Sequence, residues 1–218
     1  MKYTKDDVRN AMLVYAVTDR AWLKEGETLA EVLGSVLENG ATLVQLREKD
    51  ASEEEILAEA YQLKEVCARH QVPLIINDSV EIALRCDADG VHVGQSDIQG
   101  RDIRALIGPD KILGMTARSV EEAQAAEKAG ADYIGTGAVF GSTTKKNAKY
   151  MTPERLREIT ASVNIPVVAI GGICLKNIDQ LAGSGIDGVA VVSGIFAEKD
   201  PGEATRLLVE KAKKVVLE

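Results

Sequence analysis

The sequence of 218 residues contains few cysteines and histidines, which limits the kinds of site that it can build. Its three cysteines, Cys67, Cys86 and Cys174, are odd in number and widely spaced, unlike a disulfide framework or a zinc ribbon. His70 and His92 are the only histidines, and they form no His-x-x-x-His or His-Glu-x-x-His pattern. The sequence therefore argues against a zinc hydrolase, and it favours free thiols in a reducing compartment.

The sequence also lacks an excess of basic residues and any long apolar run. Its 34 acidic and 26 basic side chains give a net charge of -8 at pH 7, which argues against non-specific binding to nucleic acid or to anionic membranes. The longest apolar runs, such as residues 165–170, are too short to span a bilayer. No apolar segment follows the polar first twelve residues, so we expect no signal peptide. We therefore expect a cytoplasmic protein without a nucleic-acid or membrane partner.

Short β-branched runs alternate with stretches of helical spacing along the chain. The apolar residues between positions 29 and 37, for example, follow the i, i+3, i+4, i+7, i+8 spacing of a helix that buries one face. The eight runs that we expect to be strands span residues 13–18, 43–47, 74–77, 91–93, 112–116, 133–140, 167–171 and 189–193. A hydrophobic fraction of 45% is enough for one sizeable core, and we expect a single domain over residues 1–218.

A weak internal repeat supports a register of eight strand–helix units. Similar five-residue segments lead into the second, fourth, sixth and eighth expected strands, at residues 40–44, 87–91, 130–134 and 185–189. Three of these segments begin with a glycine, which suits the left-handed residue that often ends a helix. Eight such units predict an α/β fold, a single (β/α)8 TIM barrel. A doubly wound open sheet is the alternative.

Polar side chains extend the second expected strand at its C-terminal end, where barrels of this kind carry their chemistry. Side chains alternate between the two faces of a strand, so Gln45, Arg47 and Lys49 share one side. Two cations that point into a barrel need anionic partners, because burying unpaired charge is costly. The alternative is a structural ion pair with Glu48 or Asp50.

Two acidic residues follow the third and fourth expected strands. Asp78 comes directly after the third, and Asp97 lies three residues beyond Gly94 at the end of the fourth. Carboxylates on adjacent strand ends could share one Mg2+, which takes one or two carboxylates and completes its shell with water and phosphate oxygens. The alternative is that each carboxylate caps the helix that follows it.

Glycines and hydroxyls mark the last three strand ends. The loop at residues 140–146 offers hydroxyls, backbone N–H groups and lysine, and glycines follow the seventh and eighth strands at Gly171, Gly172 and Gly194. Phosphate sites after strands seven and eight recur in this fold, and glycines let the backbone approach a ligand closely. The alternative is a set of solvated loops and tight turns. We assign no catalytic role to His92, which lies within the fourth strand.

Together these segments resemble the thiamin phosphate synthase family, from about the first expected strand to the eighth. The resemblance is carried by six segments: YAVTD at residues 15–19, VQLREK at 44–49, IND at 76–78, GVHVGQ at 90–95 together with Asp97, FGSTTK at 140–145 and AIGGI at 169–173. It implies a transferase that couples 4-amino-2-methyl-5-pyrimidinylmethyl diphosphate with thiazole phosphate. Thiamin phosphate and diphosphate would form by a dissociative, Mg2+-dependent substitution.

The resemblance also implies roles for individual residues. Asp78 and Asp97 match the Mg2+ ligands. The residues that match the pyrimidine diphosphate site are Gln45, Leu46, Arg47, Glu48, Lys49, Asn77, Thr116 and Lys145. The residues that match the thiazole phosphate site are Ser142, Thr143, Thr144, Gly172, Val192 and Ser193. Arg47, Lys49 and Lys145 would be catalytic, because they would stabilise the charge on the departing diphosphate.

Some positions depart from the family pattern. Gly141 and Ser142 stand where the family has Pro and Thr, and Thr116 stands where a serine is common. A thiazole phosphate tautomerase on the same barrel is the second hypothesis, although it would not need the two acids or the two cations. A non-catalytic sensor of phosphorylated ligands is the third. The sequence leaves the oligomeric state open, and a homo-oligomer is compatible with it.

Overall fold

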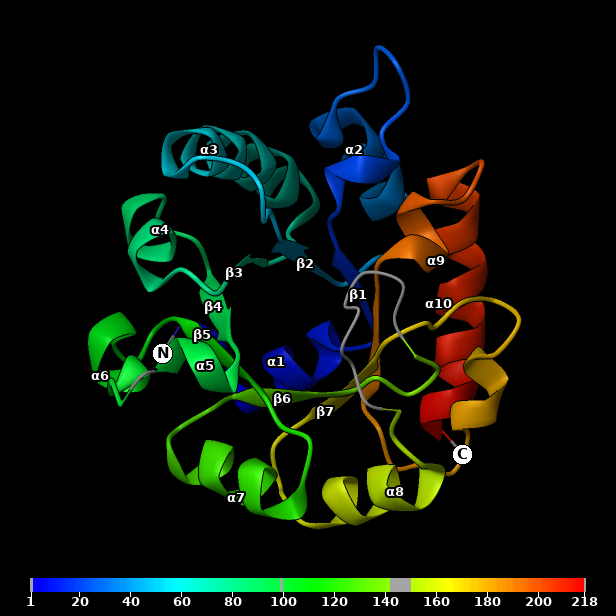
Figure 1. Cartoon of the computed structure of the whole chain (residues 1–218). Coiled ribbons are helices and arrows are strands. Elements are labelled where there is room, and N and C mark those ends of the chain that lie inside the picture. Colours follow the sequence, from blue (N-terminus) through cyan, green and yellow to red (C-terminus); the bar gives the residue numbers. More distant parts are fainter. Residues whose placement is uncertain (1, 99, 142–149, 218) are drawn as a thin grey trace.

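The computed structural model describes residues 2–98, 100–141 and 150–217, and its eight parallel strands close into a barrel in chain order (Figure 1). Pairing of Ala16 with Val191 joins the first strand to the last, which excludes the open sheet and confirms the predicted (β/α)8 fold. The strands are β1 (Val14–Val17), β2 (Leu43–Leu46), β3 (Leu74–Asn77), β4 (Gly90–Val93), β5 (Ile112–Thr116), β6 (Tyr133–Gly137), β7 (Val167–Ile170) and β8 (Gly188–Val191).

The sixth strand is shorter than the sequence suggested. It ends at Gly137, where an added Cβ would lie 1.9 Å from the carbonyl oxygen of Ile170 on the neighbouring strand. Beyond this close approach, Val139 and Phe140 still donate backbone hydrogen bonds to Ile170 and Gly171. The chain therefore continues beside the end of β7, outside the regular strand ladder.

Helices surround the barrel in Figure 1 and connect successive strands. They are α1 (Lys5–Ala11), η1 (Arg20–Trp22), α2 (Leu29–Glu38), α3 (Glu53–His70), α4 (Val80–Arg85), α5 (Gln95–Ile98), α6 (Ile103–Ile107), α7 (Val120–Lys128), α8 (Pro153–Ala161), η2 (Ile178–Leu181), α9 (Ser193–Phe196) and α10 (Pro201–Leu217). Within the described ranges, none of these helices has the length and apolarity needed to cross a membrane.

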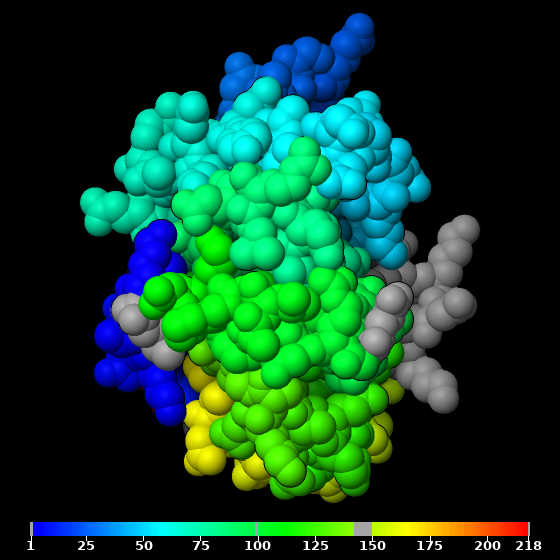
Figure 2. All heavy atoms as spheres, turned by 90° about the vertical axis from the view of Figure 1, so that its left-hand side faces the viewer, coloured from blue at the N-terminus to red at the C-terminus, as the bar shows by residue number. Residues whose placement is uncertain are grey.

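The apolar core has two parts. The larger part lies between the barrel and the surrounding helices. The smaller part fills the barrel interior, where Val8 and Met12 of the N-terminal segment pack against strand residues such as Ile75 and Val168. Helix α1 therefore closes the N-terminal end of the barrel, at its centre in Figure 1 and at one edge of the side view in Figure 2. The opposite end is left to form a cavity.

The internal repeat of the sequence marks a ring of side-chain hydrogen bonds at the closed end. In each repeat, a Thr or Asp side chain before an even-numbered strand accepts a backbone N–H from the odd-numbered strand before it. The four bonds are Val14 N to Thr42 Oγ1 (2.9 Å), Leu74 N to Asp89 Oδ2 (2.9 Å), Leu113 N to Asp132 Oδ2 (2.7 Å) and Val167 N to Asp187 Oδ2 (2.8 Å).

Each carboxylate of this ring also pairs with a cation. Lys2 pairs with Asp89, Arg104 with Asp132, and Arg9 with Asp187. At the N-terminal end of the barrel, the carboxylates thus accept hydrogen bonds from strand N–H groups that would otherwise have no partner on a neighbouring strand. The repeated segments therefore stabilise the fold, as expected for residues at the N-terminal face of such a barrel.

Candidate active site

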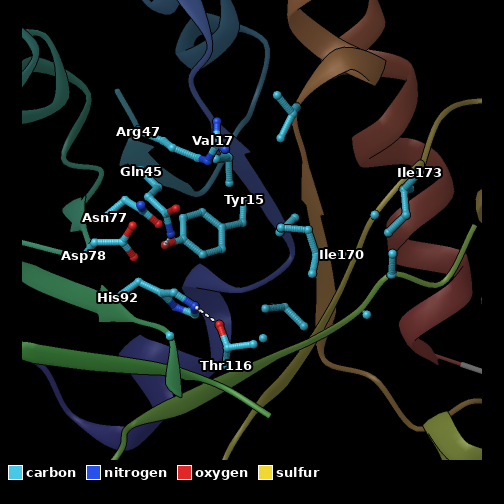
Figure 3. A pocket seen from close by; sticks show the side chains of 18 of the residues that line it. Tyr15, Val17, Gln45, Arg47, Asn77, Asp78, His92, Thr116, Ile170 and Ile173 are labelled. Carbon is cyan, nitrogen blue, oxygen red and sulfur yellow. Dashed lines mark hydrogen bonds between the residues drawn. The ribbon is translucent and has the colours of Figure 1, made fainter. Parts of the chain in front are cut away.

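A cavity of about 470 Å³ opens at the C-terminal ends of the strands, and every strand contributes residues to its wall. The wall has a polar side and an apolar side. Figure 3 shows Gln45, Arg47, Asn77 and Asp78 facing Ile170 and Ile173 across this space. A concave site with a few convergent polar groups is the usual form of a small-molecule site.

The residues after β2 alternate as the sequence predicted. Gln45, Arg47 and Lys49 all line the cavity. Leu46 points the other way, into the core between barrel and helices, where it is 1% exposed. Glu48 also lies away from the cavity wall, as the period of two along a strand requires. A part for Leu46 and Glu48 in the pyrimidine diphosphate site stays a prediction.

Glu48 has its own partner outside the cavity. Its Oε2 lies 3.1 Å from Arg20 Nε, whereas its Oε1 is buried and accepts no hydrogen bond from the described residues. Burial raises the pKa of the Glu48 carboxyl, and the charge of Arg20 opposes that shift. Arg47 and Lys49 form no ion pair with the part of the chain that the structure describes. The proposed alternative, an ion pair between these cations and Glu48 or Asp50, is therefore not what the structure shows.

Asp78 lies in a backbone conformation that is uncommon for a residue with a side chain. Its φ is 65°, and its N–H donates a 2.8 Å hydrogen bond to the carbonyl oxygen of His92 on β4. The side chain lines the cavity, while Ser79 caps α4 by accepting the N–H of Ile82. Asp78 is therefore not the cap of its helix. Strained positions of this kind tend to occur at functional sites.

Asp97 combines a local structural role with a place in the cavity wall. Its Oδ2 accepts the backbone N–H of Gly94 at 2.8 Å, which supports the first turn of α5, and the residue lines the cavity. A Cβ on Gly94 would lie 2.9 Å from that oxygen, so a glycine permits the approach. The capping alternative is thus correct for one oxygen of Asp97.

The donor set fits Mg2+ better than a transition metal. Asp78 and Asp97 both reach the cavity, and two carboxylates with water and phosphate oxygens are a usual Mg2+ shell. Over residues 2–98, 100–141 and 150–217, no cluster of three or more His, Cys, Asp or Glu side chains could hold a metal by itself. A cation here would depend on a phosphorylated ligand for much of its binding.

The turn after β7 requires glycine at two successive positions. Gly171 and Gly172 have φ values of 105° and 67°, and a Cβ on Gly172 would lie 2.7 Å from the carbonyl oxygen of Phe140. The side chain of Asn177 holds this turn, because its Nδ2 donates to Gly172 O and its Oδ1 accepts from Cys174 N, both at 2.9 Å. The sequence predicted the glycines, but it gave no sign of Asn177.

The end of β8 packs directly against that turn. Helix α9 begins at Ser193, and a Cβ on Gly194 would lie 2.4 Å from the carbonyl oxygen of Ile173. Gly172, Val192 and Ser193 therefore line one part of the cavity, as the predicted phosphate site requires. The other residues predicted for that site, Ser142, Thr143 and Thr144, lie outside the described residues, as does Lys145.

A chain of hydrogen bonds, buried at Tyr15 and half-buried at His92, crosses the base of the cavity, and sequence reasoning missed it. Gln45 Nε2 donates to Tyr15 Oη at 2.6 Å, and Tyr15 Oη lies 2.8 Å from Tyr133 Oη. Tyr133 Oη lies 3.0 Å from His92 Nδ1, and His92 Nε2 lies 3.1 Å from Thr116 Oγ1. The last of these contacts is dashed in Figure 3. Burial raises the pKa of both tyrosines, so their hydroxyls keep their protons at neutral pH.

Two more residues belong to the cavity wall without having been predicted there. Arg118 adds a third cation from the loop after β5, and Gln95 donates a 2.7 Å hydrogen bond to the carbonyl oxygen of Thr116. Arg118 follows Thr116 by two residues, so the alternation used for Gln45 and Arg47 would have pointed to it.

The cations gather near two carboxylates, and the glycine turns lie where barrels of this fold bind phosphate groups. Fold and site together define a (β/α)8-barrel enzyme with a polar small-molecule site. The family described as thiamine monophosphate synthase matches residues 14–195 of the chain, and the chain belongs to that family. It is thus a transferase of thiamine biosynthesis, as the resemblance in its sequence implied.

Individual relatives agree with this assignment. The chain is 48% identical over 196 residues to a thiamine-phosphate synthase of Clostridioides difficile, which covers 90% of this chain and 93% of the relative. It is 50% identical over 184 residues to a thiamine-phosphate synthase of Caldanaerobacter subterraneus, covering 84% and 86% of the two chains. The solved thiamine phosphate pyrophosphorylase of Pyrococcus furiosus superposes with a TM-score of 0.86 at 37% identity, covering 95% of this chain and 98% of that one.

Proposed function

We propose that this enzyme joins 4-amino-2-methyl-5-pyrimidinylmethyl diphosphate to thiazole phosphate, with Mg2+, and releases thiamin phosphate and diphosphate. The observation that carries the proposal is the division of one cavity into two phosphate-compatible ends. Arg47, Lys49 and the two aspartates form one end, and the glycine turn at Gly172 forms the other. Two phosphorylated substrates could then meet between them.

The cationic end suits a leaving diphosphate. Asp78 and Asp97 would hold Mg2+, which as a Lewis acid supplies stabilisation of negative charge on phosphate oxygens when it is bound. Arg47 and Lys49 line the same wall and would bind the remaining oxygens. Lys145, predicted for this role too, lies outside the described residues. Gln45, Asn77 and Thr116 line the adjoining wall, where the pyrimidine would be held.

The glycine end suits the phosphate of the second substrate. Phosphate groups in this fold are commonly bound by the loops after strands seven and eight and by a short extra helix. Here the turn at Gly172 packs against the start of α9, which places Val192 and Ser193 beside it. Backbone N–H groups of these residues would donate to the thiazole phosphate, together with the predicted Ser142, Thr143 and Thr144.

The proposed dissociative substitution needs no covalent bond to the protein, and the cavity wall is compatible with it. In the described part of the cavity wall there is no cysteine, and both ring nitrogens of its one histidine, His92, already contact hydroxyls. The bond from the pyrimidine methylene carbon to the diphosphate oxygen would break first, and its electron pair would leave with the diphosphate. The thiazole nitrogen would then supply the pair for the new carbon–nitrogen bond. Arg47 and Lys49 would stabilise the charge that develops on departure.

One experiment separates this function from the two alternatives. The purified protein is incubated with each substrate alone and with both, and the products are resolved by chromatography. The proposal requires thiamin phosphate and diphosphate only when both substrates are present. A tautomerase would convert the thiazole phosphate alone, and a sensor would bind a ligand and leave it unchanged; either result would overturn the proposal.

Two further expectations stay predictions. A cytoplasmic location is supported by three free cysteines, Cys67, Cys86 and Cys174, which suit a reducing compartment. A homo-oligomer is compatible with the sequence, and sedimentation analysis would determine the assembly state.

A further inference from the structure

We propose that the chain Tyr15–Tyr133–His92 is a positioning device that holds the side-chain amide of Gln45 and fixes the Thr116 hydroxyl as a hydrogen-bond donor toward the cavity. The inference rests on the proposed function, because its consequence is selection of a 4-aminopyrimidine over a 4-oxopyrimidine. The buried Tyr15 and Tyr133 and the half-buried His92 act through Gln45 and Thr116 rather than on the substrate itself.

The direction of the chain follows from its first member. The amide nitrogen of Gln45 can only donate, so Tyr15 Oη accepts this hydrogen bond at 2.6 Å. Tyr15 is 1% exposed, and among the described residues its hydroxyl has one other partner, Tyr133 Oη at 2.8 Å. Its hydrogen must therefore be donated to Tyr133, because a buried hydroxyl hydrogen without an acceptor is unfavourable.

The same reasoning determines the tautomer of His92. The hydroxyl of Tyr133, having accepted from Tyr15, donates its own hydrogen to His92 Nδ1 at 3.0 Å. A neutral imidazole that accepts at Nδ1 carries its hydrogen on Nε2. His92 Nε2 then donates to Thr116 Oγ1 at 3.1 Å. The opposite direction would leave the Tyr15 hydrogen unused at the fully buried start of the chain.

The two ends of the chain lie in the cavity wall. Gln45 donates one amide hydrogen to Tyr15, so its amide oxygen and its second amide hydrogen are the groups available to a ligand. Thr116 accepts from His92, so its hydroxyl hydrogen is available for donation. In Figure 3 the side chains of Gln45, Tyr15, His92 and Thr116 surround one side of the space. The wall thus presents the Gln45 amide and, at Thr116, a donor whose direction the chain fixes.

This pattern matches one pyrimidine form and opposes another. A 4-aminopyrimidine has ring nitrogens that only accept, which complements the Thr116 hydroxyl, and its amino group can donate to the Gln45 oxygen. A 4-oxopyrimidine carries a hydrogen on one ring nitrogen, and that N–H would face the Thr116 hydroxyl donor to donor. A site built to bond polar groups strongly rejects an analogue that leaves those groups unpaired.

Tyr133→Phe tests the chain with little change in shape, because it removes one hydroxyl and keeps the ring that lies edge-on to Tyr15. The first readout is the ¹⁵N NMR spectrum of histidine-labelled protein without substrate, with His70→Gln used to assign His92. The wild-type ring should be the Nε2–H tautomer, and Tyr133→Phe should shift it toward a mixture. A wild-type ring in the Nδ1–H or doubly protonated state would overturn the proposal.

The second readout is selectivity, measured as the ratio of kcat/KM for the 4-amino and 4-oxo pyrimidine diphosphates. Tyr133→Phe should lower this ratio about tenfold, the effect of losing one net hydrogen bond. Tyr61→Phe, which removes an exposed hydroxyl bonded to Arg85 O, should leave it unchanged. An equal loss of kcat/KM for both substrates, with the tautomer of His92 unchanged, would show a merely structural role for Tyr133 and contradict the proposal.

The two readouts also separate this proposal from the proposed function. The NMR result needs no turnover, and the selectivity can be measured as binding by calorimetry if no thiamin phosphate forms. If the protein formed no thiamin phosphate, the tautomer of His92 and the preference for binding the 4-amino pyrimidine would still test this proposal directly. Should Tyr133→Phe not fold, Tyr15→Phe breaks the same chain at its first step and carries the same predicted outcomes.

Discussion

The carboxylate of Asp89 accepts the backbone N–H of Leu74 at 2.9 Å, and so joins the turn before β4 to the first residue of β3. The same carboxylate accepts from Tyr3 Oη and pairs with Lys2, which ties the N-terminal segment to the barrel floor. Burial alone would raise the pKa of Asp89, but hydrogen bonds from Lys2, Tyr3 and Leu74 outweigh it and lower that pKa.

Asp89→Asn should therefore lower the free energy of unfolding by about 1–2 kcal/mol at pH 7. A lowered folded-state pKa gives stability that is full above the unfolded value of about 3.9 and is lost as the pH falls through the folded value. The difference between the wild type and the variant should thus shrink below about pH 4. Urea denaturation across this range measures it, with the exposed Asp6→Asn as control. A difference that persisted undiminished at low pH would contradict the ionic account.

Gly172→Ala should weaken both the fold and the binding of thiazole phosphate. The residue has a φ of 67°, and its added Cβ would lie 2.7 Å from Phe140 O, so the free energy of unfolding should fall by about 2 kcal/mol. Gly34→Ala is the matched control, since Gly34 lies inside α2 with nothing within 4 Å and should gain about 0.5–1 kcal/mol. Thermal denaturation and calorimetry give both quantities. Unchanged phosphate affinity in a folded Gly172→Ala protein would remove this turn from the site.

Asp78→Asn should reduce Mg2+-dependent turnover by roughly 10²-fold while the protein stays folded. Asparagine keeps the tolerance for a φ of 65° but removes the anionic ligand. Asp102→Asn is the control, because Asp102 caps α6 through Ala105 N and does not line the main cavity. The measurement is initial rate against Mg2+ concentration, with circular dichroism to follow folding. Unfolding of Asp78→Asn would instead support a structural role for this carboxylate.

Lys145→Ala should lower turnover more than it lowers thiazole phosphate affinity. The predicted role of Lys145 is to stabilise charge on the departing diphosphate, and loss of one such interaction commonly costs about 10²–10³ in kcat. Its sequence neighbour Lys146 supplies the control variant, Lys146→Ala, which should change neither quantity much. Single-turnover rates and equilibrium titration give the comparison. The reverse pattern would assign Lys145 to the second substrate's site.

Local periodicity was enough to predict much of this molecule. The strand–helix alternation gave the barrel, and the period of two placed Gln45, Arg47 and Lys49 in the cavity. The same period shows why Leu46 and Glu48, included through the family resemblance, turn away from it. Properties that depend on neighbours along a strand can be derived from sequence, because the backbone geometry of a strand is fixed.

Features that depend on contacts across the barrel could not be derived in this way. Tyr15 and Tyr133 come from strands on different sides of the barrel, and only closure of the sheet brings their hydroxyls to 2.8 Å. Asn177 likewise meets Gly172 through a loop whose shape the sequence did not reveal. The repeated segments were recognised as equivalent turns, but their shared hydrogen bonds to the preceding strands needed the structure.

The most direct test of the proposed function follows thiamin phosphate formation while Mg2+ is restored to chelator-treated protein with both substrates present. We expect no product above background at the start and a rate that rises with Mg2+ to saturation. Equal rates with and without excess chelator would contradict the role given to Asp78 and Asp97, and no product from folded protein at saturating Mg2+ would contradict the synthase itself.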